Sequence, residues 1–235
     1  MRKKWTLFLA ACLCVLLLTA CGTANNAQPS NSNDTSNNAQ SKPEILEITH
    51  QLGTATVQKN PQKVVVFDYG ALDTLDRLGV EVAAVAQASL PPYLEKYKSD
   101  SYENAGSLQE PDFEAIDALE PDLILISGRQ SEAYEELSKI APTVFIGVDT
   151  TRYMESFENN MRTLGEIFGL EDKVEQELAK IHEKIENLKQ QASSINGKGL
   201  IVLTTGGKVS AYGPNSRFGI IHDVFGIEPA DPNIE

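Results

Sequence analysis

The sequence predicts an α/β fold of two lobes with mostly parallel sheets, joined by one long helix, with the second lobe truncated. From about residue 44 to 150, short apolar runs typical of buried strands alternate with amphipathic helices. Residues 151–196 then show only the period of a helix, and a strand pattern resumes at 197. A lobe matching the first would need roughly 100–120 residues, so 197–235 is expected to be only the start of the second.

The expected N-terminal lobe, residues 44–150, begins with a β-hairpin that turns at Gly53. The continuous apolar run Val64–Phe67 predicts a strand buried on both faces. An amphipathic helix at 71–78 follows, and Gly79 is expected to end it. The remaining elements expected in this lobe are a strand at 82–86, a helix at 112–119, a strand at 123–126, a helix at 132–140 and a strand at 143–146.

Two apolar stripes in residues 151–196, separated by Gly169, predict two connecting helices. The second helix is expected to run about 24 residues, or ~36 Å at 1.5 Å per residue. A coiled-coil segment is an alternative, but barely two heptads follow Gly169, so a rigid strut between lobes is favoured. Beyond 197 we expect strands at 200–203 and 208–211 and a helix at 220–225.

The first 20 residues read as a lipoprotein signal peptide. A basic start, Arg2-Lys3-Lys4, precedes an apolar core from Leu7 to Leu18, too short for a permanent span of ~20 residues. Leu-Thr-Ala before Cys21 resembles a bacterial lipobox, in which that cysteine is lipidated; an ordinary signal peptide with a chance cysteine is the alternative. Residues 21–43, rich in Asn, Ser and Gln, are expected to form a flexible tether.

Composition excludes several classes of function. The formal net charge is −13, whereas nucleic-acid binding needs a basic face. Two of the three cysteines lie within the leader, so no disulfide framework or thiolate metal site is expected. The three histidines, His50, His182 and His222, fall in different segments, which disfavours a direct metal-ion binder. We find neither a Gly-x-Ser-x-Gly elbow nor a paired-His zinc motif, so the chain is not expected to be an enzyme.

Several motifs occur together with the leader and the strut helix: Pro61–Asp68, Leu119–Ile124 and Gly213–Gly219. In this combination the chain resembles the iron-siderophore substrate-binding lipoproteins of ABC importers, the helix-hinged class of periplasmic binding proteins. Ser127–Ser131 and Ser216–Gly219 resemble its catecholate, petrobactin-binding branch. The resemblance implies that a cleft between two lobes holds a ferric siderophore, with petrobactin favoured, and that no resident cofactor is needed.

The resemblance implies two ligand-binding arginines, and the position of Tyr69 in the loop after Val64–Phe67 makes it a third candidate. Arg129 and Arg217 match positions whose guanidinium groups face the anionic iron-catecholate centre, and Arg suits this task as a permanent planar cation. Arg129 follows a strand, where open α/β sheets bind ligands, and Arg217 is expected at a helix start, where free N–H groups favour anions. Each could instead be a solvated arginine. Tyr69 could line the cleft or simply be a half-buried packing tyrosine.

The resemblance also implies partners and a location. Glu114 matches a position that docks onto arginines of the membrane permease, although it could be a plain helix-surface residue. The expected protein is a monomer, anchored through a lipid on Cys21 to the outer face of a cell membrane, with a Gram-positive cell favoured, and it works with a permease and its ATPase. A haem or cobalamin binder of the same fold remains an alternative, as does an adhesive or structural surface lipoprotein.

Overall fold

The computed structural model of the protein describes residues 43–234. The predicted signal peptide at 1–20, the lipidation site Cys21 and the tether as far as residue 42 lie outside the described residues. Within the part that is described, no helix is both long and apolar enough to cross a membrane.

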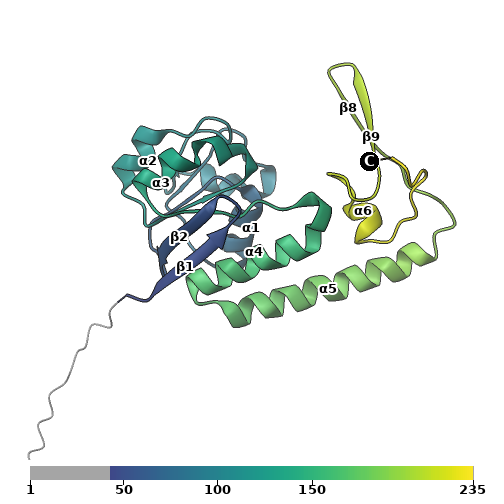
Figure 1. The fold of residues 1–235 in the computed structure, drawn as a ribbon, viewed down its shortest axis with the longest axis horizontal. Coiled ribbons are helices and arrows are strands. Elements are labelled where there is room, and N and C mark those ends of the chain that lie inside the picture. The colour runs from purple at the N-terminus through teal and green to yellow at the C-terminus, as the bar shows by residue number, and fades with distance from the viewer. Residues whose placement is uncertain (1–42, 235) are drawn as a thin grey trace, which may run out of the picture. The chain divides into compact units, whose positions relative to one another are not determined.

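A five-stranded parallel sheet forms the centre of the N-terminal lobe (Figure 1). Its strand order is β5-β4-β3-β6-β7, and every pair of neighbours is parallel, as the alternating strands and helices predicted. The chain therefore runs outward from β3 to β5, then returns to the other side of β3 to add β6 and β7. The strands span Val64–Val66 (β3), Ala84–Val85 (β4), Glu103–Asn104 (β5), Leu123–Ile126 (β6) and Thr143–Phe145 (β7).

Side chains that alternate along the strands feed two separate cores. Val64 and Val66 belong to one core, whereas Val65 and Phe67 belong to the other, as the two-residue period of a strand requires. Because both faces are covered, the strands are apolar without a break. The first core is completed by α1 (Tyr69–Leu78), α4 (Tyr153–Phe168), the hairpin of β1 (Ile45–His50) and β2 (Gly53–Gln58), and the 3-10 helix η1 (Pro92–Lys98). The second core is completed by α2 (Phe113–Leu119) and α3 (Tyr134–Ile140).

Local signals at the ends of these elements confirm several predictions. The hairpin pairs β1 (Ile45–His50) with β2 (Gly53–Gln58) in antiparallel register. Gly79 ends α1 with φ 72°, a left-handed conformation that glycine adopts without steric cost. The helix expected at 132–140 begins later, because residues Gly128–Ala133 form the 3-10 helix η2. Helix η1 and the two-residue strand β5 were not predicted, since neither carries a helical or alternating apolar pattern.

The two connecting helices are confirmed as α4 and α5 (Glu171–Ser193), the latter 23 residues long. Gly169 ends α4 with φ 62°. At Gly165 an added Cβ would lie 2.9 Å from Cγ2 of Val174, so a glycine is what lets the two helices approach closely. A small apolar cluster, formed by Met161, Val174, Leu178 and Leu78, joins both helices to α1.

The residues after α5 form a two-stranded antiparallel hairpin, β8 (Ile201–Thr205) and β9 (Lys208–Tyr212), at the predicted place. The helix expected at 220–225 is shorter: α6 spans only Ile220–Asp223. Three residues after the end of α6, Gly226 adopts the left-handed conformation with φ 76°, and the chain turns there.

Tyr97 of η1 provides a test of the first core through pH. Its side chain is 2% exposed, and burial, reinforced by the negative charge of Asp76, raises the pKa of Tyr97 to about 12. The neutral phenol is thus favoured by folding, so its contribution to stability is complete below pH 10 and is lost as pH rises towards 12. Tyr97→Phe should flatten this alkaline loss of unfolding free energy, measured by urea denaturation between pH 9 and 12.

The matched control is Tyr93→Phe, because Tyr93 lies on the same 3-10 helix and is 66% exposed. This control should lose stability with pH as the wild type does. An unchanged alkaline decline in Tyr97→Phe would contradict the assignment of Tyr97 as the buried phenol that titrates.

Candidate ligand-binding site

The order of strands reverses between β3 and β6, and two predicted site residues follow these two strands. Tyr69 lies just after β3 and Arg129 just after β6. The strands are hydrogen-bonded neighbours in parallel register, with Val66 opposite Leu125. Open α/β sheets bind ligands in the crevice outside the carboxyl ends of the strands, at the point where the order reverses. The sheet therefore brings both residues to the position where a ligand site is expected on topology alone.

Tyr69 is half-buried, and its hydroxyl donates a 2.7 Å hydrogen bond to the carbonyl of Ala86, just after β4. Burial raises the pKa of Tyr69, and the positive charge of Arg129 acts in the opposite direction. The phenol is thus a neutral group within the electrostatic reach of the Arg129 guanidinium. Its hydrogen bond and partial burial fit a packing role as well as a cleft-lining one.

Arg129 is exposed on η2, and the turn that carries it is held by a buried polar side chain. The Gln130 side chain is 1% exposed; its Oε1 accepts a 3.1 Å hydrogen bond from Ser127 N–H, and its Nε2 donates to the carbonyl of Leu108, after β5. Sequence reasoning missed Gln130, although the Ser-x-x-Gln spacing from Ser127 is a capping-box signal that would have found it. Arg129 therefore projects from a turn that Gln130 ties both to Ser127 and to the loop after β5.

Arg217 lies in the turn between β9 and α6 and is exposed. Its guanidinium carbon is 5.2 Å from the ring centroid of Phe218, and that ring packs edge-on against Tyr212 at 4.8 Å. The expectation that Arg217 stands at a helix start is wrong, because the four-residue α6 begins at Ile220. No hydrogen bond or ion pair within residues 43–234 joins Arg217 to Tyr69 or Arg129.

The predicted site arginines differ from the other described arginines in their ion pairing. Over residues 43–234, the arginines that form ion pairs with carboxylates are Arg77, Arg152 and Arg162. Arg129 and Arg217 are not among them, so their charge remains available to an anionic ligand. This is the feature that an anion-binding site requires, because a paired arginine has already satisfied part of its donor fork.

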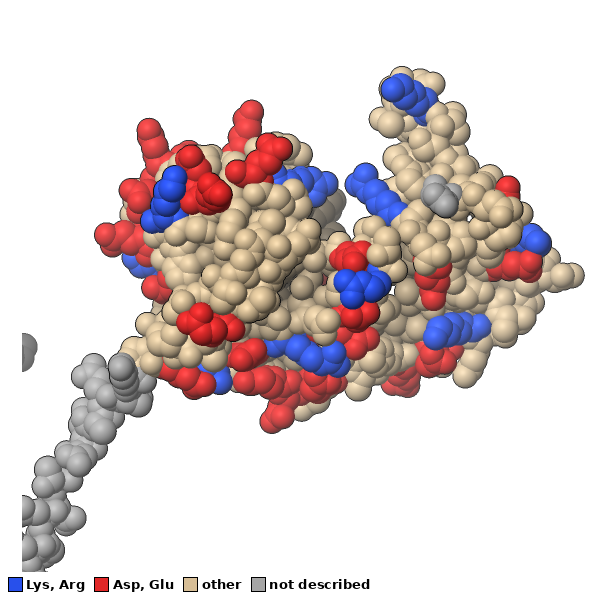
Figure 2. All heavy atoms as spheres, viewed as in Figure 1, with Lys and Arg blue, Asp and Glu red and all other residues tan. Residues whose placement is uncertain are grey.

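Glu114 lies on α2, in the first turn after the N-cap Asp112, and is exposed. Figure 2 shows acidic side chains gathered over the part of the lobe that contains α2 and α3. A negative surface of this kind would favour a basic partner, because complementary charge steers association.

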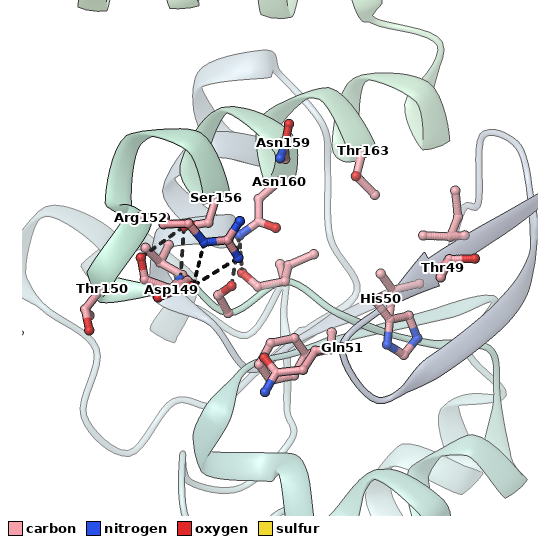
Figure 3. A pocket seen from close by; sticks show the side chains of 16 residues that line it. Thr49, His50, Gln51, Asp149, Thr150, Arg152, Ser156, Asn159, Asn160 and Thr163 are labelled. Carbon is pink, nitrogen blue, oxygen red and sulfur yellow. Dashed lines mark hydrogen bonds and ion pairs between the residues drawn. The ribbon is translucent and has the colours of Figure 1, made fainter.

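A hollow of about 700 Å³ lies elsewhere in the lobe (Figure 3). It is lined by the β1–β2 turn, the loop after β7 and the start of α4, and none of the predicted site residues lines it. Its arginine, Arg152, is paired with Asp149 and Glu155, as the dashed lines of Figure 3 show for Asp149. Burial lowers the pKa of the lining residue His50, which keeps its imidazole neutral. This hollow therefore offers an anionic ligand little net positive charge.

Metal-ligating side chains do not converge in the part of the chain that the structure describes: no group of three or more His, Cys, Asp or Glu residues is placed to hold a metal ion.

The chain belongs to the periplasmic binding protein family, which matches residues 64–235. It is 50% identical to the petrobactin-binding protein YclQ of Bacillus subtilis over 99% of this chain and 72% of that protein. It is 33% identical to the ferric-anguibactin-binding protein FatB of Vibrio anguillarum over 80% of this chain and 60% of that protein. The family resemblance predicted from the motifs is thus confirmed.

Solved structures of siderophore-binding proteins have the same fold as this chain. The crystal structure of YclQ superposes with a TM-score of 0.80 at 54% identity, covering 82% of this chain and 69% of that one. The catecholate-siderophore binding protein VctP of Vibrio cholerae superposes with a TM-score of 0.73 at 39% identity, covering 82% and 70%. These matches confirm the predicted α/β fold class.

Gln130 provides a test of how the Arg129 turn is held. Gln130→Ala removes both side-chain hydrogen bonds and leaves the buried N–H of Ser127 and the part-buried carbonyl of Leu108 without their partner, so we expect a loss of ~1–3 kcal/mol in unfolding free energy. The amide of Ser127 should also exchange with solvent faster. Gln109→Ala, at an exposed glutamine, should change stability by less than about 0.5 kcal/mol. Equal effects of the two substitutions, measured by urea unfolding and hydrogen exchange, would contradict this account.

Proposed function

We propose that the chain is the extracytoplasmic substrate-binding component of an ABC importer and that it captures a ferric siderophore of the catecholate type, with petrobactin favoured. The observation that carries the proposal is the placement of Arg129 beside Tyr69 at the reversal of the strand order, exposed and, within residues 43–234, free of carboxylate partners. The similarity to proteins named as binders of petrobactin, ferric anguibactin and catecholate siderophores supports the same ligand class.

The chemistry of such a ligand fits these side chains. A ferric catecholate complex spreads negative charge over flat aromatic rings and their oxygens. An arginine offers a planar cation with forked donors, which can approach the oxygens or stack on a ring. A neutral tyrosine presents an aromatic face without adding negative charge. Binding then requires no bond-making, and the protein acts by capture and release rather than by catalysis.

Two alternative functions would require different side chains at the site. A haem or cobalamin binder could share the fold, since fold does not fix ligand. Arg129 and Arg217, which have no carboxylate partner among residues 43–234, favour a ligand with a net negative charge over a largely apolar macrocycle. An adhesive or structural lipoprotein would require no such arginines at the strand ends.

The cellular setting is also proposed. Cys21 would carry the lipid that holds the protein at the outer face of a cell membrane, with a Gram-positive cell favoured because such a cell has no outer membrane to retain a soluble protein. There the monomeric protein would deliver its ligand to a permease driven by an ATPase. Recovery of the protein from culture medium rather than from membranes would count against the anchor.

Arginine substitutions test the site. Arg129→Ala and Arg217→Ala should each weaken the binding of a ferric catecholate roughly ten- to hundredfold, because a charge-assisted contact contributes ~1.5–3 kcal/mol. The matched control is Arg162→Ala, since Arg162 pairs with Glu158 on its own helix α4 and with Glu175 on α5. Dissociation constants from ligand quenching of tyrosine fluorescence provide the measurement. If all three variants bind alike, the site assignment is wrong.

Docking to a permease is tested through Glu114. Glu114→Arg reverses one charge of the exposed acidic surface on α2 and should leave siderophore affinity unchanged while impairing uptake of the ferric complex by cells. Glu166→Arg, at an exposed glutamate of α4, is the control that should leave uptake intact. Loss of affinity in Glu114→Arg, or normal uptake, would refute the docking role.

A further inference from the structure

The turn that carries Arg217 is closed by a carboxylate from the helix that follows it. The backbone N–H of Asn215 donates a 2.7 Å hydrogen bond to Oδ2 of Asp223, eight residues further on. Asn215 has φ 58°, a left-handed conformation that a non-glycine residue adopts at a cost unless its surroundings hold it there. The bond to Asp223 therefore stabilises the unusual backbone conformation from which the turn is built.

Gly219 leaves room for this carboxylate. A Cβ added at Gly219 would lie 2.6 Å from Oδ2 of Asp223 and 3.0 Å from the backbone nitrogens of Asn215 and Ser216. Gly219 has φ −61° and ψ −15°, values that any residue adopts, so backbone freedom does not require glycine here. What requires it is space, because the Asp223 carboxylate occupies the concave side of the turn, where a side chain would otherwise stand.

Arg217 lies between these anchors. It is flanked by Ser216, whose hydroxyl donates a 2.6 Å hydrogen bond to the carbonyl of Gly213, and by Phe218, which packs against Tyr212. The guanidinium is exposed and lies over the Phe218 ring. The turn is thus fixed at both of its ends, while the Arg217 guanidinium has no hydrogen-bond or ion-pair partner among residues 43–234.

From this geometry we infer that Asp223 is a positioning residue for Arg217. It does not touch the ligand. By accepting the Asn215 N–H it fixes the 214–219 turn in the one conformation that presents the guanidinium. The turn is then already ordered before the ligand arrives, and binding loses less conformational entropy. The inference rests on the proposed function, in which Arg217 faces an anionic siderophore.

Asp223 also takes up one backbone N–H of this turn. Free backbone N–H groups at a helix start were expected to attract the anionic ligand. Here the N–H of Asn215 is already occupied by a carboxylate from within the chain. That N–H is therefore not available to an anionic ligand, whereas the exposed guanidinium of Arg217 is.

The first part of the test is a double-mutant cycle on the full chain, with ferric petrobactin as the probe. Asp223→Ala should weaken binding roughly tenfold, the low end for a hydrogen bond to a charged group. In an Arg217→Ala background the same substitution should have no further effect, because Asp223 acts through Arg217. Equal weakening in both backgrounds, or no weakening in either, would overturn the inference.

Two further variants separate positioning from a general loss of structure. Asp223→Asn keeps an oxygen acceptor at the same place and should retain the wild-type affinity. Gly219→Ala keeps the carboxylate but drives it away from Asn215, and should weaken binding as Asp223→Ala does. Asp231→Ala removes a carboxylate from a different turn of the same segment, where it accepts the Asn233 N–H, and should bind normally. Failure of rescue by Asp223→Asn would overturn the inference.

Hydrogen exchange distinguishes failure of this inference from failure of the proposed function. The Asn215 amide should exchange faster in Asp223→Ala and Gly219→Ala than in the wild type without any ligand present. If exchange is unchanged, Asp223 does not hold the turn, whatever the ligand. If exchange rises as expected but Arg217→Ala binds ferric petrobactin normally, the role of Arg217 in the proposed function is what fails.

Discussion

Strands β3 and β6 lie side by side with every residue buried, and the order of the sheet reverses between them. This arrangement is the constraint on which the rest of the lobe depends. Covering both faces of these strands requires α1, α4 and the hairpin on one side and α2 and α3 on the other. The chain must then leave β3 and β6 in opposite directions, and the loops after the two strands diverge at one edge. Tyr69 and Arg129 stand on those two loops.

A second theme is that the chain's own polar side chains fix the turns from which its arginines project. Gln130 bonds the η2 turn to the loop after β5, and Asp223 closes the turn before α6. Arg129 and Arg217 lack carboxylate partners within the described residues. By contrast, Arg152 in the turn before α4 and Arg162 on α4 form ion pairs with carboxylates. Fixed turns with free cations are suited to capture of a rigid anion, since little order has to be gained on binding.

The fold was predictable where a side-chain pattern spans an element. The apolar runs at 64–67 and 123–126 specified β3 and β6, and the spacing of Val174, Leu178, Ile181 and Ile185 specified the length of α5. Helices η1 and η2 and strand β5 were not predicted, because 3-10 turns and two-residue strands are too short to show a repeating apolar pattern. The end of α6 was also not predicted, because the helix ends at Asp223, three residues before the left-handed Gly226. The predicted site residues came from the ends of strands and from motifs that resemble a known family. The bond from Gln130 to Ser127 has a local signal, but the bond from Gln130 to Leu108 spans 22 residues, and no local pattern encodes it.

The central claim is that an anionic ferric catecholate binds beside Tyr69 and Arg129. It is tested most directly by titrating the protein with ferric petrobactin while following tyrosine fluorescence, with a ferric hydroxamate and haem as comparison ligands. The tyrosines report binding because the single tryptophan, Trp5, lies within the predicted signal peptide. The account predicts tight, saturable quenching by ferric petrobactin and none by the other two at the same concentrations. Quenching by the hydroxamate or by haem, with petrobactin silent, would contradict it.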